Sequence, residues 1–86
     1  MMIMVDGAAL AAACREIRDS TGQIPEVLAA QVGMSSGTWR KLETAKKKKR
    51  LRVHAEFVER VIDLHNKCGM QRKLSMADFN PHPKVN

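Results

Sequence analysis

Apolar residues recur along this chain at intervals of three and four, which is the spacing of one face of an α-helix. The first such stripe consists of Leu10, Ala13, Cys14 and Ile17. It predicts a helix over residues 8–19, with Asp6 as its N-cap and Ser20-Thr21-Gly22 at its end. Val, Ile and Thr never alternate with polar residues over a useful length, so the pattern predicts no strand.

Three further helices are predicted, over residues 25–32, 36–44 and 53–68. Pro25 suits the first turn of the second helix, and Gly33 ends that helix. Ser35 offers an N-cap hydroxyl to the third helix. The fourth is the most amphipathic, and its apolar face consists of Phe57, Val58, Val61, Ile62 and Leu64.

After residue 68 the chain carries one more apolar group and then loses its pattern. This group consists of Leu74, Met76, Ala77 and Phe79. From Asn80 on, polar residues and two prolines predict a disordered tail. With 86 residues and a mass of 9.6 kDa, the chain is the size of one small domain. We therefore expect a compact all-α protein of four or five helices, with one domain over residues 1–79 and a tail over residues 80–86.

The formal charge of the chain is +6 at pH 7, from 15 Lys and Arg against 9 Asp and Glu. The charge is concentrated, because residues 40–52 carry eight basic residues and one acidic residue, a net charge of +7. Such a segment favours an anionic partner, above all nucleic acid. Residues 46–52 show no core-facing period before Leu51, so we expect a loop or a frayed helix end there.

Other classes of protein fit the sequence less well. A chain this short is not expected to be an enzyme with a deep cleft, and it has no apolar stretch of the length that crosses a membrane. Residues 1–5 lack a basic flank, so no signal peptide is expected. Cys14 and Cys68 lie in helical apolar patterns, which fits a reducing cytoplasm. His65 and Cys68 have no second ligand pair, so we expect no metal, cofactor or small-molecule ligand.

Residues 25–44 carry the most specific pattern in the chain. Two short helices flank Gly33, and the small Ala29 allows them to approach closely. The apolar contacts of this pair would be Leu28, Val32, Met34, Trp39 and Leu42. In these positions, and in the closing Leu42-Glu43 pair, the stretch resembles the helix-turn-helix of lambda-repressor-like (Cro and XRE-type) DNA-binding domains. The close resemblance covers about 20 of the 86 residues.

The resemblance implies a domain that inserts residues 36–44 into the major groove of double-stranded DNA. The residues expected to touch bases are Ser36, Gly37, Arg40, Lys41 and Thr44. Among them, Arg40 suits the O6 and N7 of guanine. The residues expected to touch phosphates are Ser35, Thr38, Lys46, Lys47, Lys48, Lys49, Arg50 and Arg52. The implied function is that of a small cytoplasmic, homodimeric repressor of transcription, of phage or plasmid type, on a palindromic operator.

Two other functions and one structural choice stay open at this point. An antitoxin or anti-repressor would use the same fold mainly to bind a protein, and a nonspecific nucleic-acid binder would rely on the basic run alone. For the homodimer we favour a contact made by Leu74, Met76, Ala77 and Phe79. The same group can instead fold back over its own chain as a fifth helix.

Overall fold

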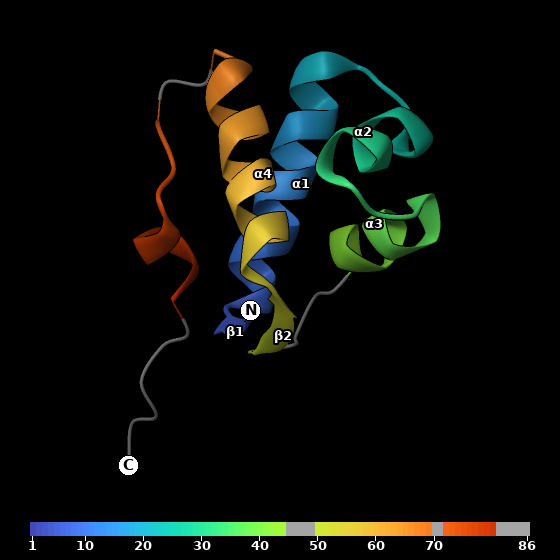
Figure 1. The fold of residues 1–86 in the computed structure, drawn as a ribbon. Helices are drawn as coiled ribbons and strands as arrows, with labels where there is room; N and C mark the ends of the chain where they lie inside the picture. Colours follow the sequence, from blue (N-terminus) through green and yellow to red (C-terminus); the bar gives the residue numbers. More distant parts are fainter. Residues whose placement is uncertain (45–49, 70–71, 81–86) are drawn as a thin grey trace.

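The computed structural model describes residues 1–44, 50–69 and 72–80. Its elements, in chain order, are strand β1 (Met2–Val5), helices α1 (Gly7–Thr21), α2 (Pro25–Val32) and α3 (Ser36–Glu43), strand β2 (Leu51–His54), helix α4 (Ala55–Lys67) and the 3-10 helix η1 (Met76–Phe79). Figure 1 shows α1 and α4 packed side by side, with α2 and α3 on one flank of this pair and η1 on the other. The described residues are therefore mostly helical, as the apolar pattern predicts.

The helices begin and end at residues that satisfy their free backbone groups. The Asp6 carboxylate accepts hydrogen bonds from the backbone N–H groups of Ala8, at 3.0 Å, and Ala9. Gly22 closes α1 in the left-handed region, with φ of 67°. Pro25 occupies the first turn of α2. The predicted bounds of α1, α2 and α3 agree with the structure to within two residues.

The prediction that the chain is purely α-helical is wrong, because β1 and β2 form an antiparallel two-stranded sheet. Leu51 and Val53 turn toward the core while Arg52 and His54 are exposed, which is the alternation of a half-buried strand. Each strand has only four residues, and such a short alternation does not stand out in a sequence. As a result, α4 begins at Ala55 rather than at residue 53, and residues 51–52 belong to a strand rather than to a loop.

The hydrophobic core lies where α1, α4 and the α2–α3 pair meet. The stripe predicted on α1 is buried in full. On α4, three residues of the predicted face are buried and two are half-buried. The largest fully buried side chains are Trp39, Phe79, Leu10, Ile17 and Leu28. Among the described residues, no helix has both the length and the apolar character needed to cross a membrane.

After α4 the chain returns along α1 and α4 as the segment that contains η1 (Figure 1). Phe79 is only 1% exposed, and the Asp6 N–H donates to the Phe79 carbonyl at 2.8 Å. Residues 74–79 thus fold back on their own chain, which is the second of the two alternatives for this group. Phe79 fills the core of its own chain, whereas Met76 and Ala77 remain exposed, and the dimer contact predicted for this group stays a prediction. Of the predicted tail, residues 81–86 lie outside the described residues.

Candidate nucleic-acid interface

α2 and α3 are joined by a turn of three residues, Gly33–Ser35, and pack against each other. Gly33 has φ of 76°, a conformation that residues with a Cβ rarely adopt. Its neighbour Met34 donates from its backbone N–H to the Ala29 carbonyl at 3.0 Å, which closes the end of α2. The Ser35 hydroxyl then accepts from the Thr38 N–H at 3.2 Å and starts α3. Each of these local features agrees with the turn predicted from the sequence.

The buried side of the helix pair consists of the residues expected to hold it together. Leu28, Ala29, Val32 and Trp39 have almost no exposed surface, and Leu42 is 8% exposed. Met34 is partly buried and packs against the same cluster. Trp39 is therefore a core residue of the domain and has no free face on which a nucleic-acid base could stack.

The opposite side of α3 faces the solvent and carries the residues expected to read bases. Gly37, Arg40, Lys41 and Thr44 are exposed, and Ser36 is half-buried. A Cβ built on Gly37 would meet nothing within 4 Å, so this part of α3 is open to a close approach. The Thr44 hydroxyl is occupied, because it donates to the carbonyls of Arg40 and Lys41 at 3.1 and 3.2 Å.

The residues expected to contact phosphates are only partly covered by the described residues. Ser35 and Thr38 are exposed at the start of α3, where their hydroxyl oxygens lie 2.9 Å apart. Arg50 and Arg52 are exposed, and Arg52 lies on β2. Lys46, Lys47, Lys48 and Lys49 lie outside the described residues. Of the phosphate candidates that the structure describes, two therefore lie at the start of α3 and two at the start of β2.

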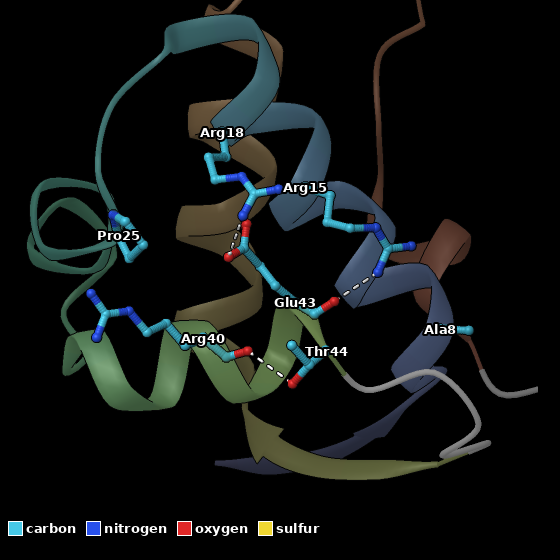
Figure 2. A pocket seen from close by; sticks show the side chains of 7 residues that line it. All are labelled: Ala8, Arg15, Arg18, Pro25, Arg40, Glu43 and Thr44. Carbon is cyan, nitrogen blue, oxygen red and sulfur yellow. Dashed lines mark hydrogen bonds and ion pairs between the residues drawn. The ribbon is translucent and has the colours of Figure 1, made fainter.

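Two arginines of α1, which the sequence did not single out, reach the end of α3 (Figure 2). Arg15 Nη1 donates to the backbone carbonyl of Glu43 at 2.8 Å, and Arg18 Nη1 lies 3.3 Å from Glu43 Oε2. The Glu43 side chain is only 6% exposed, and its Oε1 has no hydrogen-bond partner among the described residues. The two arginines thus compensate a buried carboxylate and a helix C-terminus, both of which carry negative charge. A sequence signal exists, since Arg15 and Arg18 are three residues apart beside the buried stripe of α1.

An open cleft of about 710 Å³ lies among α1, α2 and α3. The residues that line it are Ala8, Arg15, Arg18, Pro25, Arg40, Glu43 and Thr44. Figure 2 shows the three arginine side chains around this cleft, two from α1 and one from α3. Arg40 and Thr44 were expected at the interface, whereas the two arginines of α1 were not. The cleft extends the exposed basic surface of α3 onto α1.

Arg40 forms an ion pair on this surface. Its Nη2 lies 2.5 Å from Glu26 Oε1 in the first turn of α2. Both side chains are largely exposed, at 60% and 48%, so the pair is worth at most about 1 kcal/mol and is easily exchanged for another partner. The ion pair therefore orients the Arg40 guanidinium toward Glu26, while the Arg40 side chain stays exposed.

Two other polar groups are buried in the core. Burial raises the pKa of the Cys14 thiol to about 12, and the negative charge of Glu43 adds to the rise. His65 is 2% exposed, and its Nε2 lies 3.0 Å from Glu16 Oε2. Cys14 is therefore an inert core thiol, and His65 is an anchor between α4 and α1.

No family model, no curated protein and no solved structure matches this chain.

Proposed function

We propose that this protein is a sequence-specific, double-stranded DNA-binding regulator of transcription, and that α2, the turn and α3 act as a helix-turn-helix of the lambda-repressor-like type. The observation that carries the proposal is the division of α3 into two faces. Trp39 and Leu42 fix one face in the core, while Arg40 and Lys41 are exposed on the other. A helix held along one side and charged along the other has the shape and the sign that a major groove accepts.

The ion pair between Arg40 and Glu26 supports readout of bases over binding of phosphates. Even when it is released, the Glu26 carboxylate stays near Arg40, and it repels a charged phosphate more than the neutral edge of a guanine. An arginine whose fork is held on one side still presents N–H groups to guanine O6 and N7. Because the pair is exposed, releasing Glu26 costs little when a guanine replaces it.

The remaining basic residues would set affinity rather than sequence preference. Arg15 and Arg18 line the cleft beside α3, and Arg52 is exposed on β2. Contacts of such residues with phosphates position a domain on the duplex without reading its sequence. The lysine run at residues 46–49, which begins three positions after the last residue of α3, would serve the same purpose. A homodimeric repressor on paired half-sites is the form of regulation that fits a module of this size.

Selection of bound duplexes from a random pool tests the proposal directly. We expect the pool to converge on a sequence that contains a guanine essential for binding. The affinity for that sequence should then exceed the affinity for scrambled DNA by about a thousandfold or more at physiological salt. A ratio near one would show instead a nonspecific binder that depends on the basic run. A protein partner that co-purifies stoichiometrically, without any selected duplex, would favour the antitoxin or anti-repressor alternative.

A further inference from the structure

Within the described part of the chain, the outer edge of β1 is an open strand edge. The Ala55 N–H donates to the Met1 carbonyl at 2.8 Å, which fixes the hydrogen-bonding phase of the sheet. In an antiparallel pair, bonded and non-bonded positions alternate, so Ile3 and Val5 bond to β2. The N–H and C=O groups of Met2 and Met4 therefore point away from β2. Among the described residues, none bonds to the backbone of Met2 or Met4 on that side.

This open edge ends at a defined residue. Asp6 is the next residue whose backbone groups would point away from β2, and both of these groups are already bonded. Its N–H donates to the Phe79 carbonyl at 2.8 Å, and its carbonyl accepts from the Leu10 N–H. Any strand added to β1 can therefore pair with Met2 and Met4 but not beyond Val5.

The edge lacks the features with which proteins normally protect an exposed strand. Residues 2–5 contain no charge and no proline. Met2 and Met4 are also 41% and 48% exposed on the outer face of the sheet, next to Met1, which is 81% exposed. The other edge of the sheet is different, because the exposed Arg52 lies on β2. Two copies brought together along β2 would repel each other, whereas two copies brought together along β1 would not.

We propose that β1 pairs antiparallel with β1 of a second copy of this chain, so that the two sheets become one four-stranded sheet across a two-fold axis at Ile3. In this register Met2 faces Met4 of the partner, and each such pair exchanges both N–H···O bonds. This register uses the open backbone groups of both Met2 and Met4, and it preserves the hydrogen bond between Asp6 and Phe79. A two-fold axis makes the two edges identical, as most homodimers require.

The pairing leaves the DNA-facing surface free. In Figure 1, β2 lies between β1 and α3, so the second copy approaches from the side away from α3. The use of this dimer to place two recognition helices on paired half-sites rests on the proposed function. The pairing itself is measured without DNA, so it can fail or hold independently of the proposed function.

Sedimentation equilibrium of the full chain gives the first test. We expect a dimer of the 9.6 kDa chain. Met4→Pro removes an outward N–H from each copy without touching a bond to β2, and should weaken the dimer by about tenfold or more. Met4→Lys keeps the N–H and adds a charge at the same edge, and it should weaken the dimer as well. Val27→Lys is the matched control, because Val27 on α2 is 41% exposed, which is close to the 48% of Met4. Circular dichroism confirms that each variant is folded.

Cysteine cross-linking tests the register. In a Cys68→Ser background, Met2→Cys and Met4→Cys chains should form an intermolecular disulfide when mixed, and much less when each is oxidised alone, because residue 2 faces residue 4 of the partner. Equal cross-linking of either chain alone would overturn the register. A monomeric wild-type chain, or a dimer insensitive to both Met4 variants, would overturn the interface. If the wild-type chain is a monomer that still selects one duplex, the proposed function stands and only the pairing of β1 with β1 is overturned.

Discussion

Arg15 Nη1 donates a hydrogen bond to the backbone carbonyl of Glu43 over 2.8 Å, and so ties the middle of α1 to the last residue of α3. Arg15 bonds to the main chain of Glu43, whereas Arg18 bonds to the Glu43 side chain. The orientation of α3 therefore depends on two arginines of another helix, and these two contributions can be separated by mutation.

Glu43→Ala should remove the partner of Arg18 and keep the bond from Arg15. We expect a loss of about 1–2 kcal/mol in the free energy of unfolding, because a buried acceptor is removed while Arg18 remains half exposed. Glu43→Gln keeps an acceptor for Arg18 and should cost less. Urea denaturation of Arg18→Ala, Glu43→Ala and the double variant gives the coupling between them. A coupling energy of zero would show that the two side chains do not interact in solution.

Arg40→Ala should reduce binding to the selected duplex by about 1–3 kcal/mol and change binding to random DNA little, since Arg40 is assigned to a guanine. Fluorescence anisotropy on both duplexes measures the difference. The stability of the variant should hardly change, because the Arg40 side chain is 60% exposed.

The matched comparison for Arg40 is the neutralisation of Lys47 and Lys48. Replacing both by Gln should weaken binding to both duplexes alike and flatten the dependence of log K on log salt by about 2. If Arg40→Ala behaves in this way and the lysine variant changes specificity, the assigned roles are reversed.

Gly33→Ala should destabilise the fold by about 1 kcal/mol or more, because the residue has φ of 76°. A Cβ at this position would also lie 2.3 Å from Arg60 Nη1, which is the end of a long side chain that can move. Gly22→Ala isolates the backbone strain, since Gly22 has φ of 67° and nothing within 4 Å of its Cβ. Thermal melts of both variants should show similar losses. A Gly33 variant as stable as the wild type would contradict the turn.

The sequence predicted the helices better than the sheet. Caps such as Asp6 and Ser35 and turn residues such as Gly33 act locally, so the residue alone indicates what the backbone does. The pairing of β1 with β2 joins residues about fifty positions apart, and neither strand shows a long alternation. The contact of Arg15 with Glu43 is equally remote in the chain and depends on how α1 and α3 pack. The face of α3 was predictable because Trp39 and Leu42 lie three residues apart on one helix.

The Cys14 thiol should make stability depend on alkaline pH. Its pKa is raised from 9.0 to about 12 in the folded chain, chiefly by burial. Below about pH 9 the thiol is protonated in both the folded and the unfolded chain. Above that pH only the unfolded chain releases the proton, so the free energy of unfolding should fall by up to about 1.4 kcal/mol per pH unit as the pH rises toward 12.

Urea denaturation between about pH 8 and pH 10.5 measures this dependence. Cys14→Ala should be less stable overall but should lose less stability over that interval. Cys68→Ser, which removes the half-buried second cysteine, is the matched control. An identical slope in the Cys14 variant would show that other groups, such as lysines, account for the alkaline loss.

The burial of Phe79 has a consequence for synthesis of the chain. This ring occupies the same core as Val5 and Leu10, although some seventy residues separate it from them. A nascent polypeptide whose helices have already emerged from the ribosome still leaves that space unfilled. Folding of this domain can therefore be completed only once translation has passed η1 and Phe79 has left the exit tunnel.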